Sequence, residues 1–182
     1  MERLLSRAGL LVAKSQGFHP KPKVSYISAL PLGFSSDDEA MELVLEEELA
    51  SEALLARLNA SSVEGLEFLR AVTLDDKEPK ASAEAFSYEM SVPEIHRANV
   101  RRKIAQFFAS SSVEVVKTNG KTVDARACVK EMDLQDECLR MTLYERQGPE
   151  AGVREILNWL GLGSELFRSV FPNRCKTWIK SV

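Results

Sequence analysis

The 182-residue sequence predicts an α+β protein made of two tandem ferredoxin-like halves, each with the element order βαββαβ. Two observations predict this class. Hydrophobic periodicity runs twice through the same order of strands and helices, at an offset of about 95 to 100 residues. A stretch rich in Lys, Glu, Pro and Ala separates the two runs. We therefore expect a first half over residues 1–76, a linker over 77–84 and a second half over 85–182.

The second half is the clearer copy. Pro93 ends an alternating strand, Asn119-Gly120 predicts a tight hairpin turn, and Gly161 stands where a left-handed cap would end a helix. The hairpin adds one strand to the βαββαβ plan. In order, the predicted elements are strand 86–92, helix 95–109, strands 113–117, 123–129 and 138–145, helix 153–160 and strand 170–179.

The first half follows the same plan without its N-terminal strand. Its predicted elements are helix 2–8, strands 24–30 and 41–45, helix 51–58 and strand 66–74. A missing strand would leave an exposed sheet edge, which folded proteins usually cover. We therefore expect either that the chain is a fragment of a longer polypeptide or that another segment fills the gap.

Composition indicates a globular protein, with 45% hydrophobic and 28% charged residues. No apolar run approaches the roughly 20 residues of a bilayer-spanning helix, and no signal peptide is evident. The three cysteines match no metal-binding spacing, so we expect reduced thiols and no metal site. Together with the lack of an apolar span and of a signal peptide, this predicts a cytoplasmic protein without a membrane partner or a cofactor. Cys175, between Arg174 and Lys176, could have a lowered pKa through those charges.

Charge is unevenly distributed along the chain. The net charge is −3, but residues 1–90 carry −7 and residues 91–182 carry +4. Residues 37–52 hold eight acids and no base, whereas residues 1–30 hold five bases and one acid. Such segregation can steer an anionic partner to part of an acidic protein.

One basic segment is difficult to assign to a core. Lys14 to Lys23 contains two prolines on either side of Lys21 and a glycine that permits a sharp bend. Such a loop can present ammonium groups to phosphates and an aromatic ring to a base. The alternative is that Gly and Pro only shape a connection. The candidate nucleic-acid-binding residues here are Lys14, Phe18, His19, Lys21 and Lys23.

A second basic segment lies near the C-terminus. Arg168, Arg174 and Lys176 are interleaved with aromatic residues, and no acid intervenes. That composition is typical of a nucleic-acid-binding face. The alternative is that Phe171 and Trp178 are core residues, with the charges solvated on the opposite side of a strand.

Catalytic motifs are weak. There is no phosphate-binding glycine loop, no nucleophile elbow and no CxxxCxxC motif. His19 could act as a general base in metal-independent RNA cleavage, with Lys21 or Lys23 stabilising the phosphorane. No second proton carrier can be assigned from the sequence, so we assign no catalytic residue.

The loop motif also carries a family resemblance. Gly17-Phe-His-Pro-Lys-Pro-Lys23, with the preceding Arg7-Ala-Gly-Leu10 and the Leu30-Pro-Leu-Gly33 turn, resembles the bacterial radical SAM-linked domain of unknown function. Val123-Asp-Ala-Arg126 and the helix near 153–160 resemble its second half. Members are typically fused to, or encoded beside, radical SAM proteins with a cobalamin-type domain.

The resemblance implies a radical SAM protein as partner and an accessory role in RNA processing or modification, including tRNA modification. Our leading hypothesis is a non-catalytic accessory domain that binds RNA or docks substrate for a radical SAM enzyme. The alternatives are a metal-independent endoribonuclease that uses His19 and a purely structural protein-docking module.

Overall fold

The computed structural model of the chain describes residues 1–75, 79–145, 151–163, 166 and 170–180. It confirms the mixed α+β class, with four α-helices and three sheets in the described ranges. Two compact units are present. The first comprises residues 1–26 and 41–80, and the second comprises residues 27–40 and 81–181. None of the helices in the described ranges is long and apolar enough to cross a bilayer.

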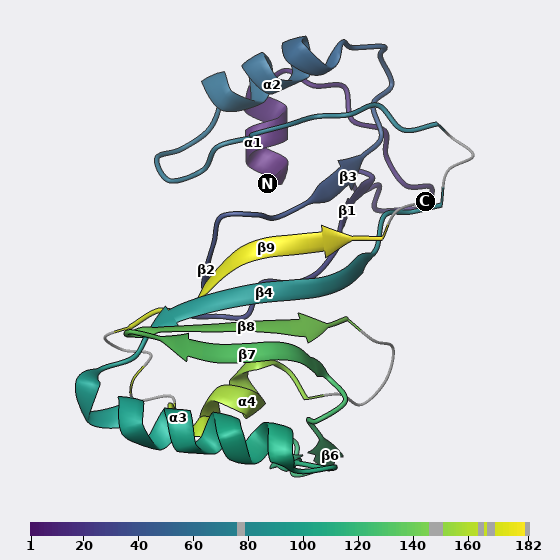
Figure 1. Cartoon of the computed structure of the whole chain (residues 1–182). Coiled ribbons are helices and arrows are strands. Elements are labelled where there is room, and N and C mark those ends of the chain that lie inside the picture. Colours follow the sequence, from purple (N-terminus) through teal and green to yellow (C-terminus); the bar gives the residue numbers. More distant parts are fainter. Residues whose placement is uncertain (76–78, 146–150, 164–165, 167–169, 181–182) are drawn as a thin grey trace. The chain divides into compact units, whose positions relative to one another are not determined.

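The second unit is built on a five-stranded sheet with the strand order β2-β9-β4-β8-β7 (Figure 1). All neighbouring strands are antiparallel except β2 and β9, which are parallel. The strands of this sheet are β2 (Ser35–Ser36), β4 (Ala83–Ser91), β7 (Val129–Gln135), β8 (Cys138–Tyr144) and β9 (Asn173–Ile179). A separate hairpin of β5 (Glu114–Val116) and β6 (Thr122–Asp124) follows the first long helix, and its Gly120 lies at the predicted turn.

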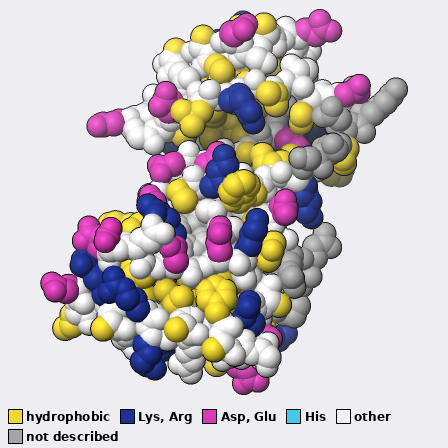
Figure 2. Space-filling view, viewed as in Figure 1, with side chains coloured by type: hydrophobic (Ala, Val, Ile, Leu, Met, Phe, Trp, Pro, Cys, Tyr) yellow, Lys and Arg dark blue, Asp and Glu magenta, His cyan; other side chains and the backbone are white. Residues whose placement is uncertain are grey.

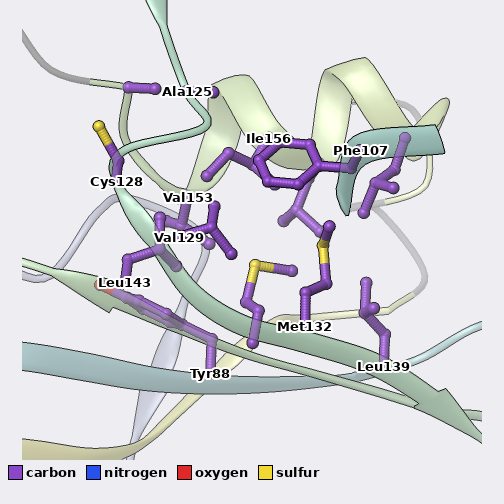
Figure 3. Packing of buried hydrophobic residues seen from close by; sticks show 14 of the residues in the cluster. Tyr88, Phe107, Ala125, Cys128, Val129, Met132, Leu139, Leu143, Val153 and Ile156 are labelled. Carbon is purple, nitrogen blue, oxygen red and sulfur yellow. The ribbon is translucent and has the colours of Figure 1, made fainter. Parts of the chain in front are cut away.

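Helices α3 (Glu94–Ala109) and α4 (Val153–Leu160) both cover the same face of this sheet (Figure 1). Alternation along the strands places one set of side chains beneath the helices. Phe107 of α3 and Ile156 of α4 point toward Met132 and Leu139 of the sheet, and all four are 5% exposed or less (Figure 3). The opposite face of the sheet, which we call the open face, carries mostly polar side chains.

Residues 27–40 belong to the second unit, although the sequence pattern placed them in the first half. Within this segment β2 pairs with β9, and the N–H of Asp37 bonds the carbonyl of Arg174. Phe34 packs edge-on against Tyr88, with ring centroids 6.0 Å apart. The predicted strand 24–30 therefore ends early, as β1 (Val24–Tyr26), because the chain leaves one sheet to join another.

The first unit contains the helices α1 (Glu2–Arg7) and α2 (Ser51–Ala60) and a two-stranded sheet of β1 and β3 (Met41–Leu43). A small apolar core holds these elements together. Its most buried members are Leu4, Leu5, Leu10 and Leu58. Ser51 is the first residue of α2, and Ala50 occupies the cap position without a side-chain bond.

The predicted strand at 66–74 is absent, although every residue of that range is described. The side-chain amide of Asn59 accepts a hydrogen bond from the N–H of Phe68 (2.8 Å) and donates one to its carbonyl (2.9 Å). These are the backbone groups that a sheet ladder would use. The segment 66–74 therefore makes no strand pairing; Phe68 packs against the core of the first unit, whereas Leu69, Val72 and Leu74 are exposed.

Candidate functional site: two exposed basic and aromatic surfaces

The segment 14–23, which we call the lysine loop, is a closed hairpin of the first unit. The N–H of Ser15 bonds the carbonyl of Lys21 (2.8 Å), and the N–H of Lys23 bonds the carbonyl of Ala13 (2.7 Å). The hydroxyl of Ser15 accepts a further bond from the N–H of Lys21 (3.0 Å). Gly17 has a φ of +128°, a conformation that L side chains rarely adopt. The loop is thus shaped by its own backbone.

The side chains of the lysine loop are directed into solvent. Phe18 is 101% exposed, and His19 and the three lysines Lys14, Lys21 and Lys23 are also exposed. Within the described ranges, no carboxylate lies within 4.0 Å of any of these three ammonium groups. The loop therefore presents an uncovered aromatic ring among cations that are not neutralised by ion pairs.

Several acids of the run 37–52 have partners other than the loop lysines. Glu47 pairs with Arg57 (3.2 Å), and Asp38 accepts a bond from the N–H of Thr177 (2.7 Å). Glu39 pairs with Arg174. The acidic run therefore does not screen the lysine loop through direct contacts.

Arg174 lies in the interior of the second unit, with only 2% of its surface exposed. Its Nη1 donates to both carboxylate oxygens of Glu39 (2.9 and 3.2 Å), and its Nη2 donates to the carbonyl of Ala29 (3.2 Å) and the hydroxyl of Tyr88 (3.3 Å). The guanidinium carbon lies 4.3 Å from the ring centroid of Phe86. A phosphate on the surface cannot reach the guanidinium group. Arg174 is therefore not a nucleic-acid-binding residue.

Burial affects two titratable groups near Arg174. It raises the pKa of the Tyr88 hydroxyl, although the neighbouring guanidinium opposes the shift. It also raises the pKa of the Cys175 thiol, and the charge of Glu89 adds to that effect. A lowered pKa of the Cys175 thiol, which the flanking charges left as a possibility, is therefore wrong, because the side chain of Arg174 points to the other face of the sheet.

Trp178 and Lys176 lie on the open face of the sheet, and both are exposed, Trp178 to 44%. The indole N–H donates to the hydroxyl of Ser87 on the neighbouring strand (2.9 Å). The Nζ atoms of Lys130 and Lys176 lie 5.7 and 5.6 Å from the ring centroid. The third basic candidate, Arg168, lies outside the described residues.

A depression with a volume of about 390 Å³ adjoins the indole at Ser87. Polar side chains of β7, β8 and β9 line it, among them Glu131, Gln135, Arg140 and Cys175. Its lining includes both acidic and basic side chains, among them Glu131, Asp133 and Arg140, and Figure 2 shows Lys and Arg side chains close to Asp and Glu side chains on the face that it presents. The depression therefore offers both hydrogen-bond donors and acceptors.

Sequence reasoning missed the exposure of Trp178, which it treated as core. A bulge in β9 is the reason. Ser87 pairs with Lys176 while Tyr88 pairs with Arg174, so Cys175 is the extra residue. An extra residue shifts the alternation by one, which places Arg174 beneath the helices and Lys176 and Trp178 on the open face. No signal in the sequence marks this bulge.

Three basic residues of α3 have structural partners. On α3, Arg97 bonds the carbonyl of Val92 (2.8 Å), Arg101 bonds the carbonyl of Asp136 (3.1 Å) and Lys103 bonds the carbonyl of Trp159. His19 has no hydrogen-bonded acid or base beside it in the part of the chain that the structure describes. Among the described residues, no group of three His, Cys, Asp or Glu side chains is placed to hold a metal ion.

Residues 1–154 match the model of a family described as an uncharacterized protein conserved in bacteria. The match includes the lysine loop and the strands β4, β7 and β8, and it ends at the start of α4. No curated protein shows significant similarity to the chain.

Proposed function

The chain belongs to this bacterial family, DUF2344, and we propose that it is a non-catalytic RNA-binding domain whose lysine loop contacts single-stranded RNA. One observation carries the proposal: a fully exposed Phe18 stands among Lys14, Lys21 and Lys23, none of which has an ion-pair partner in the described ranges. Leaving a large aromatic ring in water is unfavourable without a ligand that covers it.

The chemistry of the lysine loop suits a single strand. Unpaired bases can stack on an aromatic ring, while phosphates take up ammonium groups in any sequence context. The closed backbone of the loop supports this role, because a preformed loop loses less conformational entropy on binding than a mobile one.

The finer form of the proposal is that the bound RNA is presented to a radical SAM enzyme. Its support is the resemblance of the Gly17 to Lys23 motif to the radical SAM-linked domain. A ferredoxin-like second unit is part of the same proposal, supported by the strand order β9-β4-β8-β7 with both helices on one face. Co-purification with a radical SAM protein after nuclease treatment would test the partner.

Binding of a fluorescent oligouridylate at increasing salt concentrations tests the loop. For single strands, each neutralised phosphate contributes about 0.7 to the slope of log K against log salt. Lys21→Ala should reduce the slope by about 0.7. Lys121→Ala, which removes an exposed lysine from the β5–β6 hairpin, is the matched control and should leave the slope unchanged.

Phe18→Ala separates stacking from charge. The variant should weaken binding by about 1 to 3 kcal/mol without changing the salt slope. Its thermal unfolding should match that of the wild type, because Phe18 packs against nothing. If neither variant changes the affinity, the lysine loop is not the RNA contact.

A second candidate function, protein docking, is favoured by exposed apolar side chains of the first unit. Leu69, Val72 and Leu74 are 69%, 63% and 45% exposed on the extended segment that follows α2. A docking module would retain its partner after nuclease treatment and lose it in Leu69→Ser, whereas an RNA-binding domain would not respond to that change.

A further inference from the structure

The open face of the second unit holds an aromatic ring in a fixed orientation. The indole N–H of Trp178 donates to the hydroxyl of Ser87, whose oxygen lies 2.8 Å from the hydroxyl of Thr142. The Thr142 hydroxyl in turn donates to Glu131 (2.8 Å). This chain of hydrogen bonds crosses the strands β9, β4, β8 and β7. Because the N–H is already satisfied, only the face of the ring remains for a ligand.

Two cations lie over the ring of Trp178, each in a cation–π contact. The Nζ atoms of Lys130 and Lys176 are both within 6 Å of the Trp178 ring centroid. Neither ammonium group has a carboxylate within 4.0 Å in the described ranges. Other cations of this face are paired, as Arg140 is with Glu89 (3.9 Å). The site thus combines a planar apolar surface with two free positive charges.

The depression next to Ser87 supplies polar groups that a ligand on the Trp178 ring could contact. It is an open hollow with a volume of about 390 Å³. Ser87 belongs to both features, since it holds the indole and lines the depression. The carboxylate of Glu131 and the guanidinium of Arg140 lie in the lining, so an unpaired base beside the ring would meet both an acceptor and a donor.

A purely structural role explains only part of this arrangement. The indole pairs with Ala85 across the strands and contributes to covering it, since Ala85 is 2% exposed. Cation–π attraction draws the two ammonium groups to the ring, but like charges at one ring repel one another unless an anion lies nearby. The same ring remains 44% exposed.

We propose that the open face of the second unit is a second contact for single-stranded RNA, in which one base stacks on Trp178 and its phosphates bind Lys130 and Lys176. A duplex would not fit this chemistry, because its bases are stacked on one another and cannot cover the indole. The inference depends on the proposed function for the class of ligand. It does not depend on the lysine loop, which has separate residues.

Fluorescence titration with oligouridylate and oligoadenylate tests this contact in the full chain. The sequence has two tryptophans, and Trp159 packs against Phe107 with ring centroids 5.5 Å apart, so a Trp159→Phe background isolates the signal of Trp178. Stacking should quench that signal. Inorganic polyphosphate, which has charge but no bases, should bind without comparable quenching.

RNA affinities of substituted proteins test the contribution of each side chain. Trp178→Leu should weaken RNA binding on the order of tenfold, and Trp178→Phe should retain most of the affinity because it keeps a ring. The Lys130→Ala/Lys176→Ala double variant should weaken binding and reduce the salt slope by about 1.4. Lys180→Ala, one residue beyond β9, is the matched control for lost charge and should have little effect. The double variant keeps the indole and its hydrogen bond. It therefore tests RNA binding by the open face even if the Trp178→Leu variant does not fold.

The outcomes separate this inference from the proposed function. If the lysine-loop variants weaken binding while those of Trp178, Lys130 and Lys176 do not, the inference is overturned and the proposed function stands. The reverse result supports the inference and removes the lysine loop. Equal affinity for a mononucleotide and an RNA strand would also overturn it, as would quenching by polyphosphate equal to that by RNA.

Discussion

Arg174 joins two segments of the chain that are far apart in the sequence. Its guanidinium bonds Glu39 and the carbonyl of Ala29, both in the segment 27–40. The Nε atom has no partner among the described residues, so the group is not fully satisfied. A buried arginine in this state is costly unless its counter-charge remains in place.

Removal of the carboxylate should therefore cost more than removal of the cation. We expect Glu39→Ala to lower the free energy of unfolding by about 3 kcal/mol, the lower end for a broken buried pair, because Glu39 is 41% exposed and water can enter. Arg174→Met keeps apolar volume among Phe86 and Tyr88 and should cost less. Urea denaturation of both variants gives the comparison, and the opposite order of stabilities would contradict it.

Among the elements, α4 shows how a helix end is fixed by one residue. Gly161 ends the helix in the left-handed region, with φ +85°, as the sequence predicted. A Cβ at this position would lie 3.2 Å from the side-chain nitrogen of Asn99 on α3. Both the backbone conformation and the available space therefore favour glycine.

Gly161→Ala should destabilise the protein by about 1 kcal/mol, the usual cost of placing a Cβ in a left-handed cap. Gly163→Ala is the matched control, because its φ is not positive and its Cβ would make an ordinary contact of 3.7 Å with Asn158. Thermal unfolding of the two variants measures the difference. Equal melting temperatures would mean that the cap does not limit stability.

The strand β9 shows how one inserted residue changes which side chains a strand exposes. One bulge at Cys175 reverses the face of every residue that follows it. Without the bulge, Trp178 would lie on the same face as Arg174, beneath the helices. The exposed aromatic surface of the second unit therefore depends on a single inserted residue.

For the whole molecule, the path of the chain determines what can fold alone. Residues 27–40 leave the first unit, add β2 beside β9 and supply Glu39 to Arg174. Thr177 is held to the same segment, since its N–H bonds the carboxylate of Asp38 (2.7 Å). The linker near residue 80 is therefore not the complete boundary of the second unit.

A fragment that begins at residue 81 should be less stable than the same fragment preceded by residues 27–40 through a flexible Gly-Ser linker. The shorter fragment loses the counter-charge of Arg174 and exposes the edge of β9. We expect its urea midpoint to be lower by on the order of 1 M. Equal midpoints in circular dichroism would show that the segment 27–40 is not needed for folding.

Local patterns in the sequence were sufficient for the helices and for strands such as β4 and β8, but not for β7 (Val129–Gln135), since the predicted strand 123–129 is divided between β6 and the first residue of β7. The turn at Gly120, the cap at Gly161 and the alternation of β4 and β8 depend on backbone preferences and on one buried face. Prolines and a glycine with positive φ keep the lysine loop out of regular structure, but the sequence left open whether Phe18 packs beneath the loop, and only the structure shows that it is exposed.

The sequence by itself determined the mixed α+β class, the positions of the four helices and a basic loop near the N-terminus, because these depend on neighbours within a few residues. Only the tertiary structure decided which sheet residues 27–40 join, that 66–74 forms no strand, and which side of β9 carries Trp178. Each of these depends on hydrogen-bond partners distant in the sequence, such as Glu39 for Arg174, and no local pattern encodes them.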